Sequence, residues 1–119
     1  MANFSFFNSV AISSTVANAL AGSPFEFVGR DSRVAIALGV TYTGTLPEGA
    51  VLSTITFGSE LQLQSGSVPG IVALTSPTLP DNVIVDDVAQ AGDRLVIELV
   101  NNDASDVAPV KGIVRILPI

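Results

Sequence analysis

The chain of 119 residues contains no cysteine, no histidine and no tryptophan. Without cysteine it can form neither disulfide bonds nor thiolate metal sites. Cysteine usage therefore does not distinguish an oxidising compartment from a reducing one. The absence of histidine removes the commonest general base and the commonest metal ligand. The many serines therefore have no histidine to activate them, and no G-x-S-x-G motif occurs. These absences argue against an enzyme, and we predict no catalytic residue, no metal and no cofactor.

Charged residues are also scarce, at 13 %, against ~25 % in an average globular protein. Eleven acidic residues outnumber five basic ones, which gives a formal net charge of -6. The basic residues are scattered rather than clustered: Arg30, Arg33, Arg94, Lys111 and Arg115. Direct nucleic-acid binding needs a basic patch, so it is not expected. The scarcity of charge has two compatible explanations, a surface of serine, threonine, asparagine and glycine, or burial against neighbouring subunits.

The beginning of the chain is uncharged, because Glu26 is the first charged residue. Polar residues interrupt this stretch too often for a membrane-spanning helix, which needs ~20 mostly apolar residues. It also lacks the basic region of a secretion signal. We therefore predict no membrane segment and no signal peptide. Residues 1–23 are expected to form an N-terminal arm or an edge strand, and residues 24–119 a single β-sandwich domain.

Apolar residues that alternate with a period of two predict strands along most of the chain. The two clearest runs lie in the last quarter, at residues 95–100 and 111–117. Turn-forming residues separate the runs, and no stretch has a convincing helical pattern. Further strands are expected at residues 24–28, 33–43, 51–57, 60–64, 71–75 and 82–85.

This count of short strands predicts an all-β chain folded as an antiparallel β-sandwich. A single jelly roll with an extended N-terminal arm best fits the strand number and the size. An immunoglobulin-like sandwich is the competitor, but its cysteine and tryptophan hallmarks are absent. In a jelly roll the last two runs lie in opposite sheets and face each other across the core. The long loop at residues 101–109 favours this crossing over a tight hairpin.

Two groups of residues are candidates for contacts with a partner. The N-terminal arm carries Phe4, Phe6 and Phe7, which such a segment cannot bury on itself. The strand at residues 33–43 has bulky residues on one face and small, uncharged residues on the other, which suits close approach by another subunit. The small face consists of Ala35, Ala37, Gly39 and Thr41.

We predict no ligand for either of two polar clusters in the chain. Asp86 and Asp87 are expected in a solvated loop, because neighbours on a strand point to opposite faces and cannot act as paired carboxylates. Residues 101–106 supply oxygen atoms that calcium accepts, but they lack the spacing of a calcium loop and are typical turn formers.

Three stretches, MANFSFFNSVAISS, AGDRLVIELVNN and PVKGIVRILPI, give the chain a family resemblance. Together with the short Thr/Ser-rich strands and the acidic composition, they resemble the decoration or cement proteins of tailed-bacteriophage capsids. The resemblance implies a virion structural protein that is made in the host cytoplasm and binds the major capsid protein at the capsid surface. It also implies a homo-oligomer, with a homotrimer favoured.

Two other functions remain open at this point. A penton, spike or fibre-tip protein would also be β-rich and oligomeric. A carbohydrate-binding module belongs to a different class, but its sites usually display aromatic platforms, and this chain has no tryptophan and a single tyrosine, Tyr42.

Overall fold

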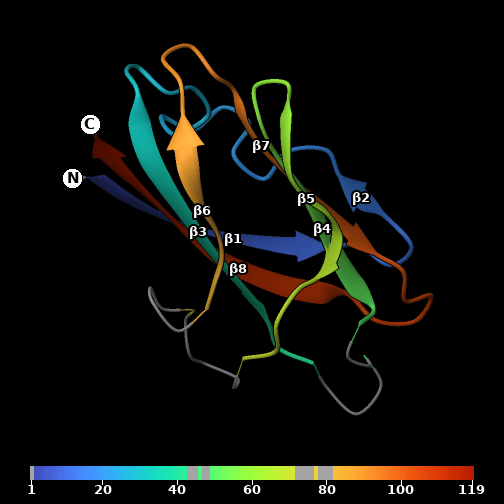
Figure 1. The fold of residues 1–119 in the computed structure, drawn as a ribbon. Coiled ribbons are helices and arrows are strands. Elements are labelled where there is room, and N and C mark those ends of the chain that lie inside the picture. The colour runs from blue at the N-terminus through green and yellow to red at the C-terminus, as the bar shows by residue number, and fades with distance from the viewer. Residues whose placement is uncertain (1, 43–45, 47–48, 72–76, 78–81) are drawn as a thin grey trace.

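The structure is a computed structural model that describes residues 2–42, 46, 49–71, 77 and 82–119. These residues form strands joined by turns and loops (Figure 1). No helix long and apolar enough to cross a membrane is found among them. The strands are β1 (Ala2–Val10), β2 (Thr15–Val16), β3 (Ser32–Val40), β4 (Val51–Phe57), β5 (Glu60–Ser67), β6 (Val83–Ala89), β7 (Leu95–Asn101) and β8 (Ala108–Pro118).

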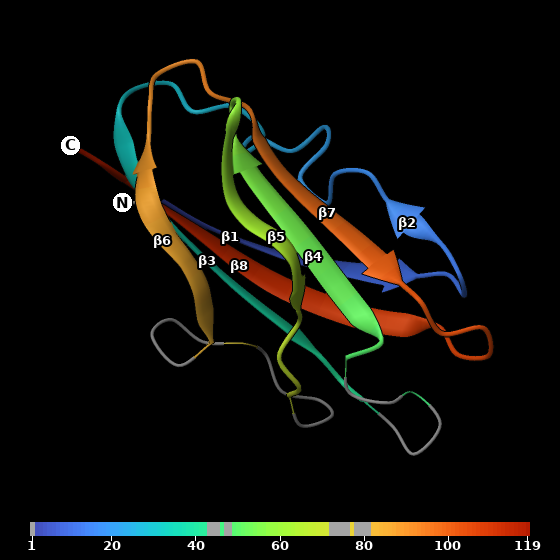
Figure 2. The same cartoon turned by 45° about the vertical axis from the view of Figure 1, so that its right-hand side comes forward.

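The strands form two antiparallel sheets of four strands each, which confirms the predicted β-sandwich (Figure 2). One sheet has the order β1-β8-β3-β6 and the other the order β2-β7-β4-β5. Only β4 and β5 follow each other within one sheet; every other connection along the chain crosses to the opposite sheet. The two most C-terminal strands therefore lie in different sheets, as the long loop between them predicted.

The hydrophobic core fills the space between the two sheets. Along β4 and β7 every second residue is buried, as the period-two pattern predicted. Leu38 and Val114 of one sheet and Ile97 and Leu99 of the other belong to the same buried cluster. Burial of side chains of this size contributes about 1.5–3 kcal/mol each, so this cluster is the main source of stability.

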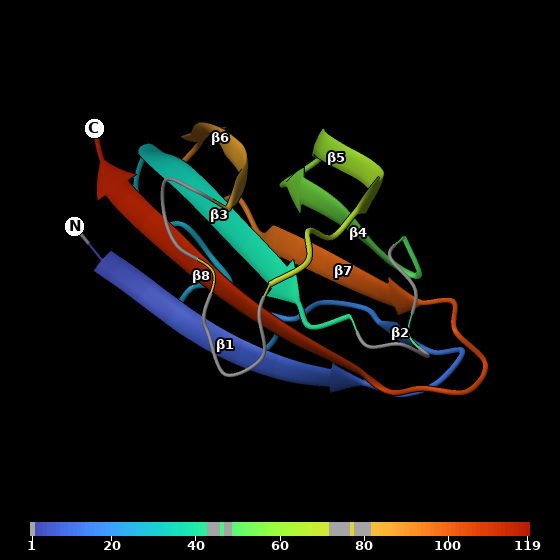
Figure 3. The same cartoon turned by 90° about the horizontal axis from the view of Figure 1, so that it is seen from below.

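The N-terminal segment is part of the sandwich. β1 pairs with β8 over all nine of its residues, from Ala2 opposite Ile116 to Val10 opposite Ala108. It forms the rim of its sheet (Figure 3). β2 is the edge strand of the other sheet and pairs with β7. Of the two predicted alternatives, arm or edge strand, the structure therefore contains the edge strand, because pairing satisfies the backbone groups of β8 that an extended arm would leave open.

Several expected strands differ from the structure in their bounds or existence, and one lies outside the described residues. β3 ends at Val40, β5 continues to Ser67, and β8 begins at Ala108, inside the loop expected at residues 101–109. Residues 24–28 form turns, and only Phe27 makes a single bridge, to Arg94. β6 continues through residues 86–89, so Asp86 and Asp87 lie on a strand and not in a loop. The strand expected at residues 71–75 falls, apart from Ile71, outside the described residues.

The side chain of Asn18 extends the edge of β7 beyond the point where β2 ends. Asn18 is buried, and its Nδ2 donates to the Leu95 carbonyl at 3.1 Å. Its Oδ1 accepts from the amides of Leu20 and Ile97, both at 3.0 Å. One carboxamide therefore replaces the backbone partners that a longer β2 would have supplied.

Asn101 holds the C-terminal end of β1 in place. Its buried Nδ2 donates to the Asp106 carbonyl at 2.8 Å and to the Val10 carbonyl at 3.3 Å. Its Oδ1 accepts from the Asp103 amide at 3.0 Å. This asparagine therefore acts as a turn former, as expected, and ties the loop between β7 and β8 to the end of β1.

Candidate partner-binding surface

The three N-terminal phenylalanines do not share one surface. Phe4 and Phe6 are half-buried and pack against the core between the sheets. The Phe4 ring stacks on Phe6 with 6.4 Å between centroids and on Phe25 with 5.2 Å. Phe7 points to the opposite side of the sheet, as the next residue on a strand must, and is 59 % exposed. Of the three, Phe7 is the one that lies on the outer face of the sheet.

The small face of β3 is covered in the isolated chain. Ala35 and Ala37 are buried, and so is Gly39. A Cβ atom on Gly39 would meet the side chain of Ile71, which lies in the connection after β5. Thr41, just beyond β3, is half-buried. At Gly39 the close approach that the small residues predicted is therefore made by Ile71 of the same chain.

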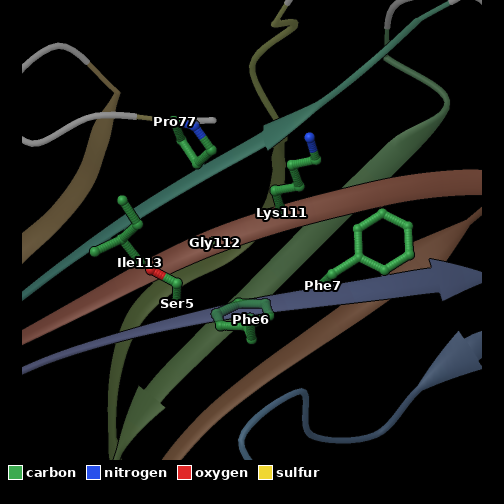
Figure 4. Close-up of a pocket in the computed structure, with 7 residues that line it drawn as sticks. All are labelled: Ser5, Phe6, Phe7, Pro77, Lys111, Gly112 and Ile113. Carbon is green, nitrogen blue, oxygen red and sulfur yellow. The ribbon is translucent and has the colours of Figure 1, made fainter. Parts of the chain in front are cut away.

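A pocket of about 310 Å³ lies on the outer face of the β1–β8 pair, next to Phe7 (Figure 4). The pairing of β1 with β8 brings the lining residues together, because Phe7 lies opposite Lys111 and Ser5 opposite Ile113. Pro77, from the connection between β5 and β6, closes one side. The full lining consists of Ser5, Phe6, Phe7, Pro77, Lys111, Gly112 and Ile113.

The lining of this pocket defines what it can hold. The polar side-chain groups in it are the Ser5 hydroxyl and the Lys111 ammonium, and the rest of its lining is apolar or backbone. Its volume is at the lower end of the ~300–1,000 Å³ typical of small-molecule sites, so it suits one large side chain. An apolar or aromatic side chain therefore fits this lining.

The sequence did not reveal Lys111, Ile113 and Pro77 as members of this surface. Their position depends on the pairing of β1 with β8, whose strands are about a hundred residues apart in the sequence. A period-two pattern tells which residues share a face of one strand, but it does not tell which strand lies beside it.

Two ion pairs hold segments that are distant in the sequence. Arg33 Nε lies 2.8 Å from Asp86 Oδ1, on β3 and β6, and Arg94 Nε lies 2.7 Å from Glu26 Oε2. The Arg33 guanidinium lowers the pKa of Asp86 by hydrogen bonding to it. The pKa of Glu26 is lowered first by the Gly22 amide, which donates to Oε1 at 2.9 Å, and then by Arg94.

The Glu26 contacts predict a pH-dependent contribution to stability. Because the pKa is lower in the folded chain, the contribution is complete above the ordinary value of 4.5 and is lost as the pH falls through the folded pKa. We expect Glu26→Gln to unfold at lower urea concentration than the wild type at neutral pH, and the difference to shrink below pH 4.5. Urea titrations of both chains across the acidic range measure this. Glu60→Gln, on the exposed β4–β5 hairpin, is the control, and an equal effect there would contradict the assignment.

The described residues contain no group of three or more acidic, histidine or cysteine side chains placed to hold a metal ion. No protein-family model matches the chain, and neither a curated protein nor a solved structure matches it closely enough to indicate a relationship. The candidate surface therefore rests on its own geometry.

Proposed function

We propose that the chain is a virion structural protein that binds the outside of a capsid shell and stabilises it. Its partner is the major capsid protein, its location is the capsid surface, and it is made in the host cytoplasm. The observation that carries this proposal is the exposed Phe7 beside a largely apolar pocket, on a protein with few charges. Such a surface gains free energy mainly by burial against another protein.

The fold is compatible with this role. The strand orders β1-β8-β3-β6 and β2-β7-β4-β5 support a single jelly roll, an architecture found in viral capsid domains. The mechanism is passive, because each copy buries a modest apolar patch on the shell. If the copies are linked in an oligomer, their weak contacts combine, since the second contact forms at a high effective concentration.

A pair of matched phenylalanine variants tests the proposed surface. Phe7 and Phe27 are both 59 % exposed, but Phe27 is not part of the pocket lining. We expect Phe7→Ser to weaken binding about tenfold, because it removes much of the apolar area of one large side chain. Phe27→Ser should bind like the wild type. Point variants are preferable to deleting residues 2–13, because that deletion would remove β1 itself.

Binding is measured by co-sedimentation of the purified chain with shells assembled from the major capsid protein of the same virus. Equal affinity of the two variants would contradict the assignment of the Phe7 surface. Counting bound copies per shell separates a decoration protein, present over the whole shell, from a penton or spike protein, present at few positions.

A further inference from the structure

The four edge strands of the sandwich differ in how they are protected against pairing with another chain. β2 is only two residues long. β5 has two register irregularities against β4 and a residue with positive φ, Ser65. β6 has a register irregularity opposite β3 and carries Asp86 and Asp87. Short length, bulges and charges are the usual devices that prevent edge-to-edge association.

β1 has none of these devices. It is nine residues long, contains neither a charged residue nor proline, and pairs with β8 in one continuous register. In a strand, alternate backbone groups point to either side, so β8 satisfies only half of those in β1. Among the described residues, no other backbone group hydrogen-bonds to the backbone of residues 2–9. A long, regular and neutral edge of this kind is a template for another strand.

We propose that the free edge of β1 pairs with β1 of a second copy of this chain. The two strands run antiparallel about a two-fold axis, and the two four-stranded sheets join into one sheet of eight strands. The register that pairs the whole of β1 is centred on Phe6, so Asn3 of one copy lies opposite Ser9 of the other.

Two observations favour a second copy over another partner. A strand that pairs with itself places its own side chains near each other, so a charge would meet a like charge, and β1 is free of charge. The half-buried rings of Phe4, Phe6 and Phe25 lie on the core side of this edge. Across the two-fold axis, Phe6 would meet the Phe6 of the other copy, and both clusters would lose exposed apolar area.

This pairing does not depend on the proposed capsid binding, since it uses the backbone edge of β1 and not the outer-face pocket. It predicts a dimer, or an assembly with an even number of chains. That differs from the homotrimer that the family resemblance implies.

The test uses charges placed directly opposite each other in the proposed register. Asn3 and Ser9 are exposed, so Asn3→Glu/Ser9→Glu should fold normally, which circular dichroism checks. In the dimer it would bring two pairs of like charges together, and we expect the dissociation constant to rise at least about tenfold. Gln64→Glu/Ser67→Glu adds two acidic side chains to the edge strand β5 and is the matched control.

Sedimentation equilibrium of the purified chains over a dilution series gives the mass. We expect twice the chain mass of 12.2 kDa for the wild type and the control, and mainly the single-chain mass for the Glu variant. Mixing the Glu variant with Asn3→Lys/Ser9→Lys should restore a dimer with one copy of each. A monomeric wild type, a trimer that persists in the Glu variant, or an equal loss in the control would overturn the proposal.

Discussion

Replacing Asn18 with alanine is expected to lower the free energy of unfolding by about 2–4 kcal/mol, since leaving a buried backbone group unpaired costs about 1–3 kcal/mol. The Asn18 carboxamide makes three hydrogen bonds of 3.0–3.1 Å. Its loss leaves the Ile97 amide and the Leu95 carbonyl without this partner at the edge of β7. Because Asn18 is buried, water does not readily take its place, and the penalty appears as lost stability.

Urea unfolding of the wild type and Asn18→Ala measures this effect. Asn102→Ala is the control, because Asn102 is an exposed asparagine on the loop that follows β7. Asn18→Asp adds a sharper comparison, because it keeps an acceptor for the Ile97 amide but loses the donor to the Leu95 carbonyl. Equal stability of Asn18→Ala and Asn102→Ala would contradict the role assigned to Asn18.

Gly112→Ala is expected to destabilise the chain by about 1–3 kcal/mol, the typical cost of overpacking a core. Gly112 is buried in β8, opposite Phe6 of β1 and Leu38 of β3. A Cβ atom there would overlap the Phe6 ring and lie 2.8 Å from the Leu38 side chain. Alanine normally stabilises a strand relative to glycine, so a loss of stability would report this contact directly.

A double-mutant cycle with Phe6→Leu tests the contact. The smaller side chain at position 6 should make room for the new methyl group, so the double variant should be more stable than the sum of the two single effects predicts. Gly29→Ala is the control, because among the described residues nothing beyond the chain neighbours of Gly29 lies within 4 Å of a Cβ placed there. Strictly additive effects in the cycle would show that the Phe6 ring does not lie over Gly112.

The strand pattern of the core could be predicted because the period of two is a local property of the sequence. Residues 51–57 and 95–100 alternate as expected, and each alternation places one face in the core. The same rule separates Phe6 from Phe7, because adjacent residues of a strand point to opposite faces. The three phenylalanines were predicted to share one contact surface, which holds only for an arm; on the edge strand that the structure contains, they divide between two faces.

The small face of β3 could not be interpreted from the sequence alone. A run such as Ala35, Ala37 and Gly39 indicates that something packs closely, but it does not distinguish another subunit from a distant part of the same chain. Ile71 lies over Gly39 because of the path of the chain after β5, which has no local signature. The pairing of Phe7 with Lys111 likewise follows from strand order and not from spacing. The jelly roll, the capsid partner and the virion location stay predictions.

The most direct test of the proposed function is whether the purified chain binds shells made of the major capsid protein alone. The proposal predicts saturable co-sedimentation with a fixed number of copies per shell, weakened in Phe7→Ser and unchanged in Phe27→Ser. A wild-type chain that stays in the supernatant at every concentration would contradict it.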